Sequence, residues 1–137
     1  MAILGIGMLG YGGIGKLHTL AYRSIPSYYP SFPRYRLEAV CTRSEKSAHE
    51  AQTDGGFAKA YTNLTDLVND PAVDVIDCVL PNDAHAEAAL LVLKAGKSIY
   101  CEKPLALSGS QAKELLAVAA ASKGTLGMTF NLSLIHI

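Results

Sequence analysis

The sequence predicts an α/β domain in which helices cover both faces of a doubly wound parallel sheet, giving three layers. Three observations predict this fold. Apolar strand-like runs alternate with helical patterns along the 137 residues, as in right-handed βαβ crossovers. The run Val73–Leu80 is rich in β-branched and apolar residues, which is typical of a strand buried on both faces. A glycine-rich turn, Gly10–Gly15, joins the first apolar run to the first helical pattern.

This glycine-rich turn has the spacing of a dinucleotide site. A strand-to-helix turn beside a pyrophosphate needs glycine for the tight turn, for close approach of the backbone to the phosphate, and for packing of helix on strand. Gly10, Gly12 and Gly15 fit these three positions. The helix that follows presents free backbone N–H groups and the positive end of its dipole to the anion. The turn residues expected at the cofactor are Gly10, Gly12, Gly13, Ile14 and Gly15.

An earlier stretch, Gly5-Ile-Gly-Met-Leu-Gly10, matches the same pattern, and the pattern alone does not choose between them. The flanking residues do. Tyr-Gly-Gly after Gly10 cannot open a helix, whereas apolar residues recur at helical spacing around and after Gly15. We therefore expect the first strand over residues 2–9 and the first helix over residues 13–25. The apolar stripe of that helix is Ile14, Leu17, Ala21 and Ile25.

The later elements are expected to alternate in order. Strands are expected over residues 35–41, 57–61, 73–80, 98–101 and 125–130. Residues that favour helix N-caps precede the intervening helices: Ser44, Asn63, Asn82 and Ser108. The last helix should present an apolar face spaced i, i+3, i+4 and i+7, which consists of Ala112, Leu115, Leu116 and Ala119.

Composition excludes several classes of protein. Lys and Arg together number 12, as do Asp and Glu; with no basic run, no nucleic-acid partner is expected. The N-terminus has no basic segment or cleavage site, so neither a signal peptide nor a membrane span is indicated and a cytoplasmic location is expected. The cysteines lack metal-like spacing, so we expect small buried side chains in a reducing cytosol and no metal site. They are Cys41, Cys78 and Cys101.

The tip of the second strand bears on the choice of nicotinamide cofactor. An acidic residue there accepts hydrogen bonds from the ribose hydroxyls and repels a 2′-phosphate. This chain has Thr42, Arg43 and Ser44 at that point and no carboxylate before Glu45. The guanidinium of Arg43 suits a phosphate. The tip therefore favours NADP, with NAD as the alternative; a solvated surface arginine is the other interpretation of Arg43.

Pro81-Asn-Asp-Ala-His85 follows the run at residues 73–80 and opens an alanine-rich helix. Pro81 ends the strand and Asn82 can cap the helix, so both have structural reasons. His85 has none, and a histidine in the first turn points toward the carboxyl edge of the sheet, where ligands bind in open α/β folds. Taken alone, the pattern also fits a surface or packed histidine.

Glu102-Lys103-Pro104 places a charged pair at the carboxyl tip of the expected strand 98–101. A buried ammonium beside a nicotinamide can polarise a substrate hydroxyl or exchange a proton with it. Lys103 is therefore the candidate catalytic residue, and Glu102 the candidate that orients it. The alternative is a surface ion pair at a turn.

Three stretches together, Gly10–His18, Pro81–His85 and Lys94–Ala106, closely resemble the glucose–fructose oxidoreductase/inositol dehydrogenase/MocA family. The resemblance covers roughly residues 2–131, and Glu-Lys-Pro at this spacing is far more specific than a lone glycine motif. It implies a Rossmann-type domain that binds NAD(P), occupying residues 1–131. The missing acid at the tip of the second strand departs from the NAD-using members.

The resemblance also implies roles for individual residues. Pro81, Asn82 and His85 would line the cofactor site. Glu102, Lys103 and Pro104 would lie near the nicotinamide, with Lys103 as the residue often assigned a catalytic role. The bond between Lys103 and Pro104 is expected to be cis.

Members of this family resemble one another in a second domain that forms the substrate pocket and dimer interface and supplies an acid or histidine beside the lysine. We expect that domain to be absent here. Residues 132–137, Leu-Ser-Leu-Ile-His-Ile, look like a translated sequencing adapter, so the native reading frame is expected to stop near Asn131; a genuine short C-terminus is the alternative. The fragment is expected to bind cofactor without turnover.

The resemblance implies a homo-oligomeric parent oxidoreductase acting on a sugar, polyol or related small molecule. Two other functions stay open at this point. One is a non-enzymatic NAD(P)-binding regulator, which would not need Lys103. The other is an NAD-dependent glycosidase, in which the bound cofactor oxidises and re-reduces the sugar.

Overall fold

The computed structural model describes residues 3–130. Its strands are β1 (Leu4–Leu9), β2 (Tyr35–Cys41), β3 (Lys59–Tyr61), β4 (Val75–Cys78), β5 (Ser98–Cys101) and β6 (Leu126–Met128). Its helices are α1 (Gly13–Tyr28), α2 (Glu45–Gly55), α3 (Leu64–Asn69), α4 (His85–Lys94) and α5 (Gly109–Ala121), with a short 3₁₀ helix, η1 (Asn82–Ala84), before α4. Every strand lies within its expected range, and β2 and β5 match theirs residue for residue.

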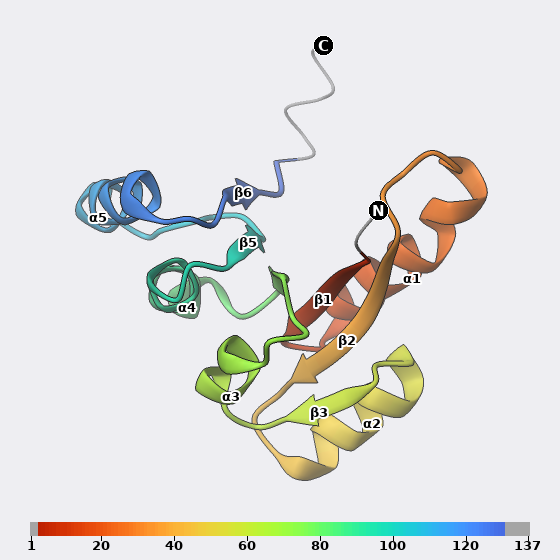
Figure 1. Cartoon of the computed structure of the whole chain (residues 1–137). Helices are drawn as coiled ribbons and strands as arrows, with labels where there is room; N and C mark the ends of the chain where they lie inside the picture. The colour runs from red at the N-terminus through yellow and green to blue at the C-terminus, as the bar shows by residue number, and fades with distance from the viewer. Residues whose placement is uncertain (1–2, 131–137) are drawn as a thin grey trace.

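The six-stranded sheet has the order β3-β2-β1-β4-β5-β6, and every neighbouring pair of strands is parallel. The chain winds outward from β1 to β3, then crosses to the other side of β1 and winds outward again from β4 to β6 (Figure 1). This order confirms the doubly wound sheet. It also creates a switch point between β1 and β4, and ligands bind outside the carboxyl ends of the strands at such a point.

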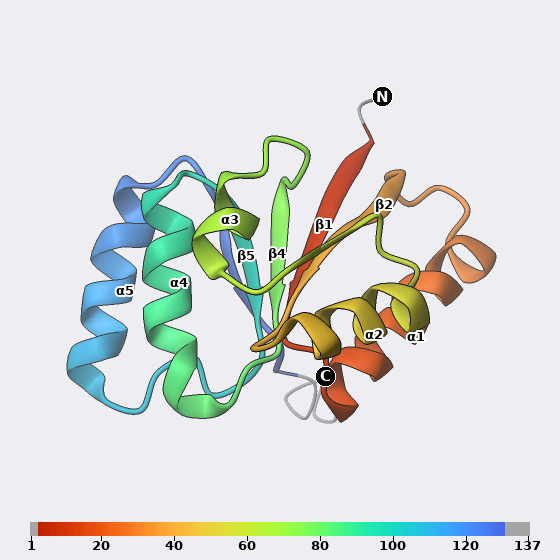
Figure 2. The same ribbon diagram turned by 90° about the horizontal axis from the view of Figure 1, so that it is seen from below.

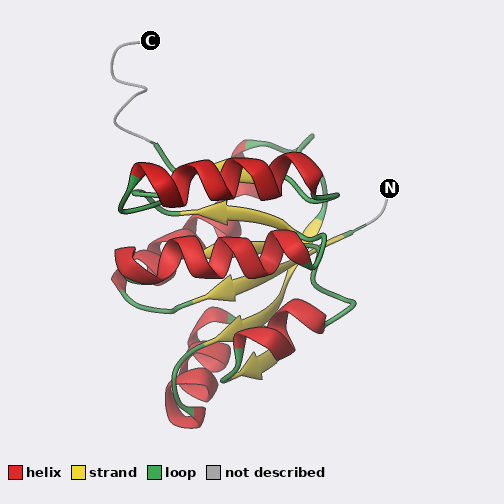
Figure 3. Cartoon of the chain, turned by 90° about the vertical axis from the view of Figure 1, so that its left-hand side faces the viewer, coloured by secondary structure: helices red, strands yellow, loops and turns green. Residues whose placement is uncertain are grey.

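Helices cover both faces of the sheet, with α3, α4 and α5 on one face and α1 and α2 on the other (Figures 2 and 3). The core under α3, α4 and α5 includes Leu67, Ile76, Val92, Leu93, Ile99 and Leu115. The core on the other face consists of Met8, Val40, Ala51 and Phe57. Because successive strand residues point to opposite faces, Asp77 faces α1 while Cys78 joins the α4 core.

Three of the four expected helix caps are confirmed. Ser44, Asn63 and Ser108 each accept a hydrogen bond from a backbone N–H of the turn that follows. The cap expected at Asn82 is wrong, because residues 82–84 form η1 and α4 begins only at His85. The backbone hydrogen bond that closes η1 satisfies a group that the side chain was expected to cap.

The apolar stripe expected to anchor α1 instead lies on its outer side. Ile14 is 47% exposed and Leu17 is 59% exposed, whereas the buried residues of α1 are Gly15 and Thr19. Gly15 packs against Met8 and Val79, and this close approach of helix to strand fixes the rotation of the helix. Neither α1 nor any other helix within residues 3–130 is long and apolar enough to cross a bilayer.

The face expected on α5 is only partly correct. Leu115 is fully buried in the α4 core, but its neighbour Leu116 is 66% exposed. A helix on the outside of a three-layer domain contacts the rest of the molecule along one narrow line. Leu115 lies on that line and Leu116 lies beside it.

Candidate functional site

The carboxyl edge of the sheet brings together the segments that the sequence singled out. The glycine turn follows β1, residues 42–44 follow β2, residues 81–82 follow β4 and residues 102–104 follow β5. Since all strands are parallel, these segments share one edge, on both sides of the switch point. Backbone hydrogen bonds tie them to neighbouring strand ends: Gly10 N–H donates to the Cys41 carbonyl, and Glu102 N–H donates to the Cys78 carbonyl, each at 2.9 Å.

The glycines of the turn fall into two groups. Gly10 has a φ of +93°, and a Cβ on Gly15 would lie 3.1 Å from the Gly10 carbonyl oxygen, so the fold itself requires both. A Cβ on Gly12 or Gly13 would meet no atom of residues 3–130 within 4 Å. The space beside these two residues is therefore free for a ligand.

This free space suits an anion. Helix α1 starts at Gly13, has no acidic residue in its first turn, and no side chain caps its N-terminus. Its first backbone N–H groups and the positive end of its dipole therefore face the open space. A dinucleotide pyrophosphate fits these donors, because it can approach a backbone that carries no Cβ.

Of the three residues predicted at the tip of β2, two contact the start of α2, and the third, Arg43, is exposed and makes no such contact. The hydroxyl of Thr42 lies 2.6 Å from the hydroxyl of Ser47, and Ser44 caps α2. Both side chains are engaged with the start of that helix. Arg43 is exposed, and among residues 3–130 it forms no ion pair.

The Glu102–Pro104 segment follows β5. The Lys103–Pro104 bond is cis, as expected. Glu102 accepts a hydrogen bond from the backbone N–H of Lys103 at 3.1 Å, but within the described residues its carboxylate does not pair with the Lys103 ammonium. The other oxygen of Glu102 instead lies 3.3 Å from Nε2 of His18. Lys103 is exposed, so residues 3–130 do not bury it as the chemical argument required.

Pro81 and Asn82 are exposed at the edge, but His85 is not. Its side chain is fully buried, with Nδ1 2.7 Å from the carbonyl oxygen of Pro104 and Nε2 2.7 Å from that of Leu80. The ring thus lies at the carboxyl edge as a packed histidine, in contact with two backbone carbonyls, and its role at a cofactor stays a prediction. His85 instead joins the end of β4 to the segment after β5.

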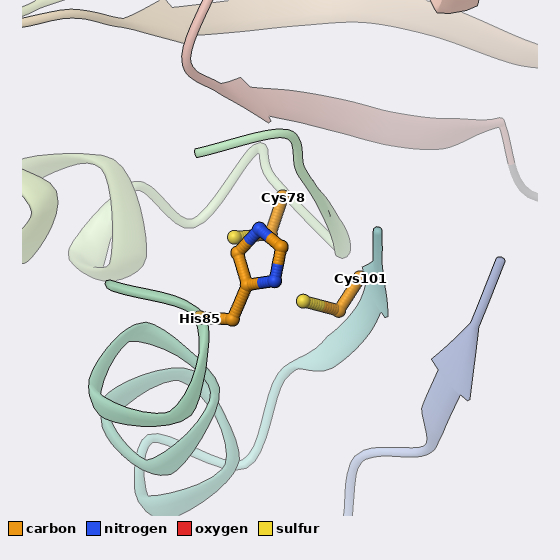
Figure 4. Close-up of side chains that lie close together, drawn as sticks. All are labelled: Cys78, His85 and Cys101. Carbon is orange, nitrogen blue, oxygen red and sulfur yellow. The ribbon is translucent and has the colours of Figure 1, made fainter. Parts of the chain in front are cut away.

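Two buried cysteines lie beside His85 (Figure 4). Cys78 and Cys101 are partners in register on β4 and β5, and their sulfurs and a nitrogen of His85 lie within 4.8 Å of one another. Sequence spacing did not reveal this cluster, although the burial of all three cysteines is confirmed. Both ring nitrogens point at carbonyl oxygens rather than at the sulfurs, so in this arrangement neither offers a lone pair to a metal.

A hydrogen bond from the Cys101 thiol to Cys78, together with burial, raises the pKa of Cys101 far above its ordinary range. Burial likewise raises the pKa of Cys41 to about 11. A thiol reacts as the thiolate. Cys41 and Cys101 are therefore unreactive core residues.

A second polar group was missed by sequence reasoning. Asp77, fully buried on β4, has Oδ2 2.9 Å from Nδ1 of His18 in α1. This hydrogen bond raises the pKa of His18; burial opposes the shift, and the charges of Asp77 and Glu102 reinforce it. The available signal was the presence of Asp77 in the middle of a run that is apolar apart from Asp74, since a buried carboxylate needs a partner.

Known proteins resemble this chain over nearly all the described residues. The model of the oxidoreductase family with an NAD-binding Rossmann fold matches residues 4–130. Levoglucosan dehydrogenase from Pseudarthrobacter phenanthrenivorans is 35% identical over 116 residues, which are 84% of this chain and 30% of that protein. The inositol 2-dehydrogenase/D-chiro-inositol 3-dehydrogenase of Lactiplantibacillus plantarum is 37% identical over 81% of this chain and 30% of its own length.

Solved structures agree. The NAD binding oxidoreductase from Klebsiella pneumoniae has a TM-score of 0.91 and 38% identity, covering 96% of this chain and 35% of that one. A levoglucosan dehydrogenase in complex with NADH has a TM-score of 0.90 and 31% identity, covering 96% of this chain and 36% of that one. This chain thus spans about a third of the length of the relatives it matches.

The matched residues contain the switch point, the glycine turn and the segment with the cis bond, so the similarity extends to the part of the fold where a ligand would bind. We conclude that this chain belongs to the oxidoreductase family of glucose–fructose oxidoreductase, inositol dehydrogenase and MocA, and that it is an NAD-binding Rossmann domain.

Proposed function

We propose that this chain is the cofactor-binding part of an oxidoreductase that interconverts a hydroxyl and a carbonyl group on a sugar or polyol, with Lys103 as the proton donor or acceptor. One observation carries the proposal: the open, uncapped N-terminus of α1 at Gly12 and Gly13 shares the carboxyl edge of the sheet with the Lys103 segment. The pyrophosphate of a dinucleotide can lie at the start of α1 while its nicotinamide ring reaches the Lys103 segment.

The chain's own residues would divide the work. The N–H groups at the start of α1 bind the pyrophosphate, and Glu102 orients the backbone at Lys103 through the 3.1 Å hydrogen bond. The cofactor, when bound, supplies hydride transfer. Lys103 moves the accompanying proton, and its ammonium is available because it forms no ion pair within residues 3–130.

We further propose NADP as the preferred cofactor, with NAD as the alternative. The exposed guanidinium of Arg43 at the tip of β2 and the lack of a carboxylate there support NADP. The levoglucosan dehydrogenase solved with NADH keeps NAD in consideration. Replacing Arg43 with Ala should weaken NADPH binding about tenfold or more and leave NADH nearly unchanged, because only NADPH has the 2′-phosphate. Lys46→Ala, an exposed cation on α2, is the matched control.

A sugar or polyol substrate is supported by the relatives, since a levoglucosan dehydrogenase has been solved with NADH and levoglucosan and with NADH and L-sorbose.

We propose that the native domain occupies residues 1–131 and that residues 132–137 are foreign. Both the tail and its boundary lie outside the described residues. If the tail is foreign, it has no part in cofactor binding, so removing residues 132–137 should leave cofactor affinity unchanged.

Calorimetric titration of this chain with NADPH and with NADH tests the proposal. Binding of at least one is expected, without oxidation of levoglucosan, because turnover requires a positioned substrate as well as a cofactor. Binding of neither would overturn the assignment of the glycine turn. Oxidation by this chain alone would overturn the inference that it is inactive.

A further inference from the structure

His18 lies between two carboxylates that come from different parts of the sheet. Its Nδ1 is 2.9 Å and 3.1 Å from the two oxygens of Asp77, and its Nε2 is 3.3 Å from Glu102. The side chains of His18 and Glu102 are each 15% exposed, and that of Asp77 is 1% exposed. The imidazole therefore connects α1, β4 and the segment after β5 in a place that water barely reaches.

The surroundings of this ring favour its charged form. Asp77 and Glu102 face it from β4 and from the end of β5, and the neighbouring titratable groups are two tyrosines. Tyr100 on β5 has its ring centroid 6.3 Å from that of His18. Burial and the nearby Asp77 carboxylate raise the pKa of Tyr22 on α1, so Tyr22 stays neutral near pH 7. No cation competes with His18 for Asp77 among the contacts within residues 3–130.

Glu102 connects the imidazole of His18 to the backbone of Lys103. One carboxylate oxygen contacts His18, and the other accepts the Lys103 N–H. His18 also belongs to the helix whose N-terminus forms the glycine turn, about one helical turn beyond Gly15. The same helix thus carries the phosphate-binding N–H groups and a contact to the Lys103 segment.

We propose that His18 is a positioning residue, whose imidazole bridges Asp77 and Glu102 and so fixes the Lys103 segment relative to the phosphate turn. This inference rests on the proposed function, in which one dinucleotide spans both places. A charged His18 holds Glu102, and a neutral His18 releases it. Loss of the bridge should weaken binding of the nicotinamide half of the cofactor and leave binding of the phosphates unchanged.

The pH range follows from the direction of the shift. The folded-state pKa of His18 lies above its ordinary 6.5, so the bridge is complete below pH 6.5 and is lost as the pH rises through the folded-state pKa. A ligand that uses only the phosphate turn should not sense this change.

The first test follows the isotopically labelled chain by NMR without any ligand. The backbone N–H resonance of Lys103 should move with the same midpoint as the imidazole of His18, because Glu102 contacts both. In Glu102→Gln, which keeps the buried pair of His18 and Asp77, that coupling should disappear. His49→Gln removes an exposed histidine and should change nothing. A Lys103 resonance that does not follow His18 would overturn the proposal, whether or not the chain binds a cofactor.

The second test compares NADH with ADP-ribose, which lacks the nicotinamide and, like NADH, has no 2′-phosphate to titrate. Affinity for NADH should fall roughly five- to tenfold as the pH rises through the midpoint of His18, the effect of losing one charge-assisted hydrogen bond. Affinity for ADP-ribose should stay constant. Equal losses for both ligands would show a general structural role and refute positioning; failure of NADPH, NADH and ADP-ribose alike to bind refutes the proposed function instead.

Discussion

Gly12 is a glycine for which the fold gives no internal reason, and replacing it separates cofactor binding from folding. Its backbone is extended, with φ −81° and ψ −159°, a conformation that other residues also adopt. An added Cβ meets no atom within 4 Å in the part of the chain that the structure describes. Gly12→Ala should keep the free energy of unfolding within about 0.5 kcal/mol of the wild type, because reduced entropy of the unfolded chain offsets a poorer N-cap.

The same Cβ would occupy the space through which a pyrophosphate approaches the backbone. A hydrogen bond to a charged group contributes about 1.5–3 kcal/mol, so loss of one should weaken dinucleotide binding by about 10- to 100-fold. Gly15→Ala should behave differently. Its Cβ would lie 3.1 Å from the Gly10 carbonyl and 3.4 Å from the sulfur of Met8, and such overpacking costs about 1–3 kcal/mol of stability.

Titration with NADPH, followed by cofactor fluorescence, and urea unfolding of the same samples measure the two effects. Gly109→Ala is the matched control, since Gly109 opens α5, also has no atom of the described residues within 4 Å of its added Cβ, and contributes nothing to the proposed site. It should change neither measurement. A Gly12→Ala protein that folds normally and binds NADPH as tightly as the wild type would refute the reasoning.

Two further predictions concern stability and are measured by urea unfolding. Leu115→Ala should cost about 2–5 kcal/mol, because the side chain is fully buried, whereas Leu116→Ala, its exposed neighbour, should stay within about 0.5 kcal/mol. Burial would raise the pKa of Asp70, but hydrogen bonds from Lys59, the Ala72 N–H and Tyr61 outweigh it and lower that pKa below its ordinary 3.8. The stability from this group is therefore complete above pH 3.8 and is lost as the pH falls through the folded-state pKa. Asp70→Asn should be less stable than wild type at pH 6, with a difference that narrows toward pH 3; an unchanged difference would contradict the inference.

Signals that act within a few residues predicted most of the fold. Ser44 and Asn63 cap helices through neighbouring backbone N–H groups, and the glycine turn specifies its own geometry through Gly10 and Gly15. The parallel sheet follows from the alternation of elements. The edge on which the site lies then follows without knowledge of any side-chain contact, because all strands end there.

Side-chain orientation could not be predicted in the same way. Apolar spacing placed Ile14 and Leu17 in the core, but Gly15 must face β1, and a helix cannot turn both sides inward. The partners His18 and Asp77 are 59 residues apart, so no local pattern joins them. Sequence reasoning placed His85 at the correct helix start but could not show that the ring turns inward to two backbone carbonyls.

The two histidines act on the same segment from opposite faces of the sheet. From the α1 face, His18 contacts the side chain of Glu102; from the α4 face, His85 lies 2.7 Å from the carbonyl of Pro104. Lys103 stands between these two attachment points, so its backbone is fixed on both sides while its side chain extends to solvent. This arrangement holds the Lys103 backbone in place and leaves its ammonium unpaired within residues 3–130, whereas proton transfer would also require that ammonium to be buried beside the cofactor. The attachment through His18 depends on the charge of its imidazole, whose pKa is raised by Asp77, so pH would act on Lys103 through this contact.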